Sequence, residues 1–176
     1  MSQLTSETSA LTPWSPALRM LTIGALVTIA AGAFENLAVA TVMPRVSDDL
    51  GGLQYYGWAF SAYTLANIIG LTVAGSESDR SGPGRPYLFG IALFCVGLLV
   101  AGAAPSMMIL ILGRAIQGFG GGLFNSAIYV VVGRAYPASA KPKMLALMSS
   151  AWVIPGLIGP ALVRGWRHRG SPRCAR

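Results

Sequence analysis

The amino-acid sequence predicts an all-α membrane protein with about five transmembrane helices. Hydrophobic residues make up 53% of the 176 positions and charged residues only 11%. The mean hydropathy is +0.58, which excludes an ordinary water-soluble domain. The apolar residues are gathered in runs of about 20, the length at which a helix crosses a bilayer. Short charged or turn-forming segments separate these runs, as expected between membrane spans.

The net positive charge does not indicate nucleic-acid binding. The chain has thirteen Lys and Arg against six Asp and Glu, but five of the thirteen lie in the last thirteen residues. The first 163 residues are therefore nearly balanced, and no folded domain has a basic face. Cys95 and Cys174 make neither a disulfide framework nor a metal-ligand set. We expect no enzymatic activity, no cofactor and no metal site.

The first transmembrane span is predicted over residues 18–43, after a polar lead over residues 1–17 that is expected to be disordered and cytoplasmic. Glu35 interrupts this span. A secretory signal peptide is the alternative, because the sequence AVA at residues 38–40 resembles a cleavage site. The acidic residue and the hydrophobic runs that follow favour a span.

Four further spans and three hydrophilic connections are expected along the rest of the chain. The spans are predicted over residues 53–75, 86–103, 107–133 and 144–163. Aromatic residues at the start of the second span are typical of the membrane–water boundary. The connections are predicted over residues 44–52, 77–85 and 134–143.

The distribution of basic residues predicts a cell-membrane protein with a cytoplasmic N-terminus. In that orientation, the outer loops before Val163 carry Arg45 alone, and six basic residues flank the spans on the cytoplasmic side. Those six are Arg19, Arg80, Arg85, Arg134, Lys141 and Lys143. The basic tail over residues 164–176 departs from the rule, because an odd number of spans places it outside.

Arg114 is the exceptional residue of the apolar segments, since the run from Pro86 to Gly133 is otherwise uncharged. An arginine at membrane depth is costly and usually faces a protein interior or an aqueous cavity with a partner. The alternative is that the Arg114 side chain snorkels to the membrane interface or marks the end of a shorter span. A count from Ser106 places Arg114 roughly 12 Å deep, which makes snorkelling difficult.

Helical spacing gives Arg114 a polar and small-residue face. Gln117 and Gly118 lie three and four positions after it, so their side chains share its face. Gly118 and Gly122 form a GxxxG pair, which allows a neighbouring helix to approach closely. Glu35, counted from the proline at residue 44, lies roughly 13 Å below the same outer surface. We therefore expect Glu35 and Arg114 to face one interior cavity, directly paired or bridged by water, with a cap or interface role for Glu35 as the alternative.

Five segments between about residues 18 and 162 resemble, in the same order, segments of one protein family. They read FENLAVATVMP, WAFSAYTLA, GSESDRSGPGR, LILGRAIQGFGGG and, in the fifth span, the pair Gly159-Pro160. Together they resemble the N-terminal part of a major facilitator superfamily transporter, most similar to the drug:proton antiporters with fourteen predicted spans. The implied fold is an incomplete N-terminal six-helix half.

The fourth span carries the strongest part of the resemblance, and the connection after the second span departs from it. Leu110, Arg114, Gln117, Gly118, Gly120 and Gly121 match the family's arginine-glutamine-glycine pattern. In the connection, Glu77 stands where the family has leucine, and Pro83 and Gly84 replace basic residues. In the fifth span, Pro155 stands where an earlier glycine is expected.

The resemblance implies a proton-coupled multidrug exporter whose partners are the lipid bilayer, protons and lipophilic small molecules. Glu35 would be the proton or cationic-substrate site, Arg114 its electrostatic modulator and Gln117 a polar partner. A cytoplasmic gate would comprise Gly75, Asp79, Arg80, Gly82 and Arg85. Helix packing would involve Gly118, Gly122, Gly156, Gly159 and Pro160. For the last three, in the fifth span, the alternative is that they are ordinary small residues at a helix contact.

Five spans are fewer than one half of such a transporter, which is built from inverted three-span repeats. The basic sequence after Leu162 suggests a frameshift or truncation near Val163. The missing half of the transporter, or a second chain, would therefore be needed for transport. The alternative function is a non-transporting membrane remnant or small interaction protein, whose basic tail contacts anionic lipid. A sugar or metabolite porter is a third, less favoured interpretation.

Overall fold

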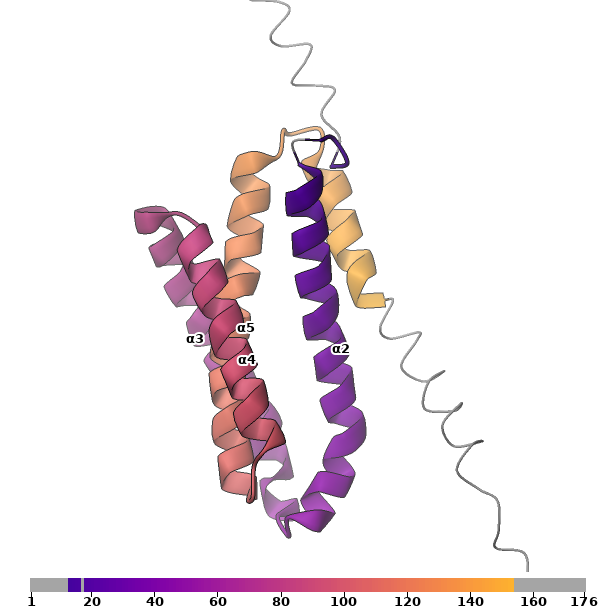
Figure 1. Ribbon diagram of the computed structural model, residues 1–176, viewed down its shortest axis with the longest axis vertical. Helices are drawn as coiled ribbons and strands as arrows, with labels where there is room; N and C mark the ends of the chain where they lie inside the picture. The colour runs from indigo at the N-terminus through magenta and orange to yellow at the C-terminus, as the bar shows by residue number, and fades with distance from the viewer. Residues whose placement is uncertain (1–12, 17, 154–176) are drawn as a thin grey trace, which may run out of the picture. The chain divides into compact units, whose positions relative to one another are not determined.

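The computed structural model describes residues 13–16 and 18–153, and every regular element in that part of the chain is helical (Figure 1). The all-α prediction is therefore confirmed. The elements are α2 (Arg19–Asp49), the short 3-10 helix η1 (Leu53–Tyr55), α3 (Tyr56–Ser81), α4 (Gly84–Gly102) and α5 (Met107–Ala135). Residues 141–153 are also helical. Four of the described helices are long and apolar enough to cross a membrane, the second of them counted with η1.

The chain divides into two compact units, one made of residues 42–136 and the other of residues 1–41 and 137–176. In the described part of the second unit, Thr22 near the start of α2 donates a hydrogen bond from its hydroxyl to the carbonyl of Pro13 at 2.6 Å. Met144 and Met148, four residues apart on one helical face, are both buried. Residues 154–163 of the predicted fifth span lie outside the described residues.

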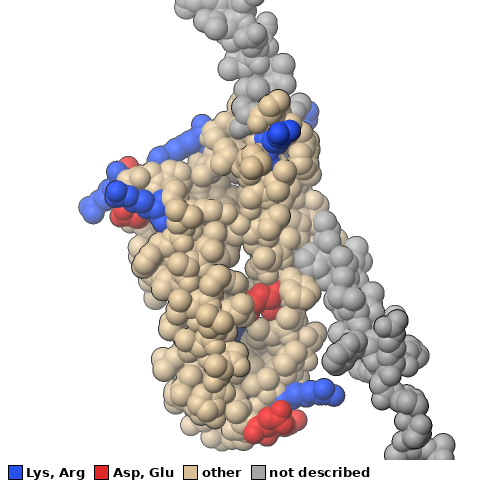
Figure 2. Space-filling model, viewed as in Figure 1, with Lys and Arg blue, Asp and Glu red and all other residues tan. Residues whose placement is uncertain are grey.

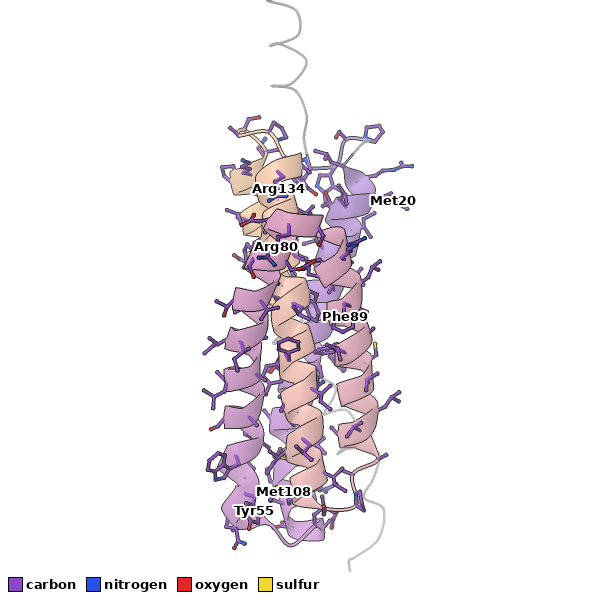
Figure 3. The ribbon with its side chains drawn as sticks, turned by 90° about the vertical axis from the view of Figure 1, so that its left-hand side faces the viewer. Met20, Tyr55, Arg80, Phe89, Met108 and Arg134 are labelled. Atoms are coloured by element: carbon purple, nitrogen blue, oxygen red, sulfur yellow. The ribbon has the colours of Figure 1, made fainter. Side chains whose placement is uncertain are left out.

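The unit of residues 42–136 is organised around α5. This helix packs along both α3 and α4, which themselves meet only sparsely (Figure 3). Within its most apolar window, 61% of α5 is buried, against 17% for α3 and for α4. Large apolar side chains on the outer faces, such as Ile69 and Leu99, are exposed. Exposed apolar faces of this kind are expected where lipid is the surrounding solvent.

The helix ends differ from the sequence prediction at two places. Residues 44–49 were expected in a loop, but α2 continues through Pro44 to Asp49. Proline lacks only one backbone donor, and helix interiors of membrane proteins tolerate it when nearby side chains bond the freed groups. The group freed by Pro44 is the carbonyl of residue 40; the Ser47 hydroxyl makes a separate bond, to the Pro44 carbonyl, at 2.7 Å. Gly51, at φ 63°, follows the helix in the left-handed region that favours glycine.

The connection predicted over residues 77–85 is also much shorter than expected. Helix α3 continues to Ser81, so residues 77–81 are helical, and α4 begins at Gly84. Gly82, at φ 82°, terminates α3 and is followed directly by Pro83. Charged residues at this point are compatible with a helix because they lie near its end, where water is available (Figure 2). Figure 2 shows that charged side chains gather near helix ends and that the surface between them is almost uncharged.

Candidate functional site

The Arg114 side chain lies inside the protein, with 2% of its surface exposed. Its Nη1 donates a hydrogen bond to Oε1 of Gln117, one turn along α5, at 2.7 Å. Its Cζ atom lies 4.2 Å from the ring centroid of Tyr63 on α3. We call these three residues, Arg114, Gln117 and Tyr63, the Arg114 cluster. The guanidinium therefore lies against protein groups and not at an exposed helix end.

The Arg114 cluster offsets part of the cost of a buried charge. A cation over a desolvated aromatic face gains about 2 kcal/mol or more, and a hydrogen bond to a charged group about 1.5–3 kcal/mol. The planar guanidinium is suited to both contacts, because it stacks on a ring and presents several donors in its own plane. Tyr63 and Gln117 are both neutral, so their contacts with Arg114 are a cation–π contact and a charge-assisted hydrogen bond.

Glycines on one face of α5 bring Tyr63 close enough to reach Arg114. A Cβ on Gly118 would lie 2.2 Å from the Tyr63 carbonyl oxygen, and a Cβ on Gly122 would lie 2.2 Å from the Asn67 carbonyl oxygen. Both positions therefore exclude any side chain. Asn67 also donates from Nδ2 to the Gly118 carbonyl at 3.2 Å. The GxxxG pair thus lies directly against α3, at the level of the Arg114 cluster.

A second set of small residues packs α5 against α4. A Cβ on Gly113 would lie 2.6 Å from the Ala101 backbone nitrogen, and one on Gly120 would lie 2.5 Å from that of Phe94. On α4 itself, a Cβ on Gly97 would lie 2.4 Å from the Gln117 nitrogen. The backbone of α5 around Arg114 is therefore enclosed from two sides. The role of Gly97 was missed by sequence reasoning, although small residues spaced along a span are a known sign of close helix packing.

A second arginine of α5 makes an ion pair at the end of the helix. Arg134 Nη2 lies 2.9 Å from Asp79 Oδ1, and Arg134 Nη1 donates to the Ser78 carbonyl at 3.2 Å. This contact ties the last turn of α5 to the last turn of α3. The resemblance implies a gate role for Asp79, whereas the charge distribution assigns Arg134 only to the basic flank of a span. A partner on another helix leaves no local sequence pattern.

The other predicted gate residues are distributed around this end of α3 and α4. Gly75 lies within α3 with open space beside it, and Gly82 terminates that helix. Arg80 and Arg85 are exposed, and Figure 3 shows Arg80 at the same end as Arg134. In the described part of the chain, Asp79 is paired with Arg134 and not with either of these two arginines.

Glu35 lies on α2 and is also buried, with 8% of its surface exposed. It belongs to residues 1–41, the other unit from Arg114. Its expected pairing with Arg114 therefore stays a prediction. Because α2 ends at Asp49, the proline from which the depth of Glu35 was counted is not the end of the helix. Gly156, Gly159 and Pro160 lie outside the described residues.

Residues 13–16 and 18–153 contain no group of three or more His, Cys, Asp or Glu side chains that would hold a metal ion. The contacts of the two α5 arginines offer two kinds of chemistry. One is a fixed positive charge within the apolar part of the protein, and the other is an exposed ion pair between helix ends.

Comparison with known proteins identifies the family. Residues 21–168 match the Major Facilitator Superfamily. A probable multidrug-efflux transporter of Mycobacterium tuberculosis is 32% identical over 165 residues, which cover 92% of this chain and 34% of that protein. Multidrug resistance protein 3 of Bacillus subtilis is 31% identical over 144 residues, covering 82% of this chain and 28% of that protein. No solved structure matches significantly.

The chain spans between about a quarter and a third of the length of the curated relatives it matches. The matched families are transporters and not enzymes. The helices, the apolar outer faces and the glycine-lined contacts of α5 agree with that assignment. The chain is a multi-pass membrane protein that belongs to the Major Facilitator Superfamily and corresponds to the N-terminal region of its members.

Proposed function

We propose that this chain provides the N-terminal part of a proton-coupled multidrug exporter of the cell membrane, of the fourteen-span antiporter type. The observation that carries the proposal is the Arg114 cluster, which contains a buried arginine on the central helix of a Major Facilitator Superfamily chain. The names of the relatives in Mycobacterium tuberculosis and Bacillus subtilis support multidrug export as the activity.

Proton coupling follows from the chemistry of Glu35 and Arg114. Desolvation favours a protonated carboxyl group, and a guanidinium nearby favours its ionised form. A conformational change that alters the separation of the two groups would therefore load and release a proton. A lipophilic cation would compete with the proton for the same carboxylate. Tyr63 and Gln117 keep the guanidinium in place while the carboxyl group changes its state.

The Asp79–Arg134 contact would act as part of the cytoplasmic gate. It joins the ends of α3 and α5 where both side chains are accessible, 53% for Arg134 and 78% for Asp79. An exposed ion pair contributes only about 0.2–1 kcal/mol, so a modest conformational energy is enough to open it. With the N-terminus in the cytoplasm, this end of the two helices would face the cytoplasm.

The remaining spans of a transporter, or a second chain that supplies them, are required for the transport path, because such paths form between the two halves of the fold. The test is complementation of a truncated relative. The Mycobacterium tuberculosis transporter is produced without the third that matches this chain, and the 176-residue chain is co-expressed with it. Efflux of a fluorescent lipophilic cation is then measured in everted vesicles with an imposed pH gradient.

We expect co-expression to restore pH-dependent efflux and Glu35→Gln to abolish it. Asp48→Asn is the matched control, since it removes an exposed carboxylate from the same helix. Stable assembly of both chains without any efflux would contradict the proposal and support a non-transporting membrane protein. Efflux that is equally strong in the Glu35→Gln variant would contradict the coupling role.

A further inference from the structure

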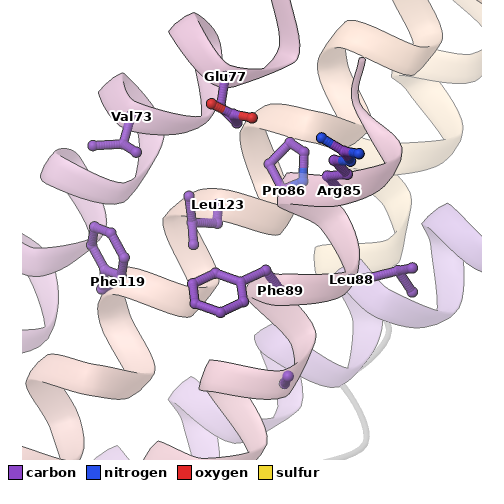
Figure 4. Close-up of a pocket in the computed structure, with 9 residues that line it drawn as sticks. Val73, Glu77, Arg85, Pro86, Leu88, Phe89, Phe119 and Leu123 are labelled. Carbon is purple, nitrogen blue, oxygen red and sulfur yellow. The ribbon is translucent and has the colours of Figure 1, made fainter. Parts of the chain in front are cut away.

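An apolar groove runs between α3 and α4 over the surface of α5 (Figure 4). It exists because glycines hold α5 close to both neighbours while α3 and α4 meet only sparsely. Its volume is about 690 Å³, within the range of roughly 300–1,000 Å³ that is usual for small-molecule sites. The groove lies wholly within the unit of residues 42–136.

The groove is separate from the Arg114 cluster, because it lies on the opposite face of α5. Phe119 and Leu123, the two α5 residues that line it, come five and nine positions after Arg114. At 3.6 residues per turn, their side chains point about 140° and 180° away from that of Arg114. A ligand of the groove is therefore distinct from anything bound beside the buried guanidinium.

Two phenylalanine rings give the groove an aromatic surface. Phe89 of α4 is 61% exposed, and Phe119 of α5 is half-buried. Figure 4 shows the Leu123 side chain between the two rings, and Leu123 is only 3% exposed, so it forms the floor. The face of an aromatic ring carries partial negative charge and attracts a cation. Val73 and Leu88 on the walls are exposed, so the groove is open toward the bilayer.

One carboxylate lies at the end of the groove. Glu77, near the end of α3, is half-buried, and its Oε1 accepts a hydrogen bond from the Ser81 hydroxyl, which fixes the carboxylate. In the described part of the chain, Glu77 forms no ion pair with Lys or Arg. Arg85 also lines this end, but it is exposed and lies on the other side of Pro86 (Figure 4), so water and salt screen its charge. The half-buried charge of the groove is therefore negative.

We propose that the groove is a binding site for one lipophilic organic cation that carries aromatic rings, of the quaternary ammonium or phosphonium class. The positive centre lies beside Glu77, and the rings of the ligand pack against Phe89, Phe119 and the apolar walls. Such a centre has no hydrogen to donate and needs none here, because Glu77 supplies an opposite charge and the phenylalanines supply π faces. An anion would be repelled by Glu77. The site is a property of this chain, because Glu77 stands where the family has leucine.

The proposal does not depend on transport, and equilibrium binding tests it with the full chain. The purified protein is titrated in detergent with radiolabelled tetraphenylphosphonium, and binding to empty micelles is subtracted. Tetraphenylborate, titrated separately, is the matched probe, because it has the same phenyl groups and the opposite charge. We expect saturable binding of tetraphenylphosphonium and binding of tetraphenylborate that is weaker by about tenfold or more. Failure of the efflux assay would leave this outcome unchanged.

Four variants separate the parts of the site. Glu77→Gln should weaken tetraphenylphosphonium binding about tenfold, because the opposite charge is lost. Phe89→Leu should weaken it about threefold, because the apolar wall stays but the π face is lost. Ala92→Phe, at an exposed position of the groove, should fill the groove and abolish binding. Arg85→Gln should leave binding equal or stronger, because it removes a positive charge.

Matched controls make substitutions of the same kind away from the groove, and each should leave binding unchanged. They are Asp48→Asn, Phe34→Leu and Leu99→Phe, all at exposed positions. Equal binding of the two probes, or binding that Ala92→Phe leaves unchanged, would overturn the proposal. Loss of binding in Glu35→Gln together with full binding in Glu77→Gln would also overturn it, because the cation would then occupy the transport site proposed above.

Discussion

Two arginines on the same helix, twenty positions apart, behave in opposite ways. Arg114 is 2% exposed and contacts the neutral side chains of Gln117 and Tyr63. Arg134 has a 53% exposed side chain and pairs with the carboxylate of Asp79. A charge is costly to bury, whereas an exposed ion pair needs little free energy to form or to break. We infer that the first is an electrostatic element of function and the second a reversible contact between helix ends.

The glycines of α5 allow α3 to approach closely enough for Tyr63 to contact the buried Arg114. Replacing one of these glycines should therefore have the largest effect on the free energy of unfolding. Gly118→Leu should destabilise the fold by about 3 kcal/mol or more, because even a Cβ would overlap the Tyr63 carbonyl. Unfolding by SDS titration, followed by circular dichroism, measures the loss. Gly133→Leu is the matched control on the same helix, where no atom lies within 4 Å of the added Cβ. Equal destabilisation by the two substitutions would contradict the packing account.

Removing the aromatic face over Arg114 should have the next largest effect. Tyr63→Leu should cost about 1–2 kcal/mol of unfolding free energy, because a desolvated cation loses its contact with the ring. Tyr63→Phe keeps the ring and should retain most of that contribution. The same SDS titration compares the two variants in the unaltered chain and in an Arg114→Met background. If Tyr63→Leu costs as much without the arginine as with it, the ring does not stabilise the charge.

The ion pair at the helix ends should give the smallest effect. Asp79→Asn, Arg134→Gln and the double variant should reveal a coupling energy of about 0.2–1 kcal/mol, because both side chains are solvated. The coupling should fall as salt is raised from low to high concentration, since salt screens exposed charges. A coupling above this range, or one that salt does not change, would show that the contact is buried in the assembled protein.

The sequence predicts the helices well because long apolar runs have few alternatives in a membrane. It predicts their ends poorly. Residues 44–49 and 77–81 contain a proline or several charges, which are typical of loops in water but are compatible with the end of a membrane helix. The decisive difference is whether the charged groups lie close enough to the helix end to reach water, and composition does not report that.

From the sequence, only the site contacts between residues of the same helix could be predicted. Arg114 and Gln117 share a face through simple helical spacing, and the structure joins them with a 2.7 Å hydrogen bond. Tyr63 and Asp79 reach their arginines through the packing of α3 against α5, which depends on which glycines face each other. No pattern within a single segment contains that information. The pairing of Glu35 with Arg114 is a relation of the same kind and stays a prediction.

The most direct test of the central claim is the energetic coupling between Glu35 and Arg114. Glu35→Gln, Arg114→Gln and the double variant are compared with the unaltered chain by SDS titration at neutral pH. If the two side chains face one interior cavity, the effects should depart from additivity by about 1 kcal/mol or more. Effects that add within about 0.5 kcal/mol would contradict the claim, because independent sites behave in that way.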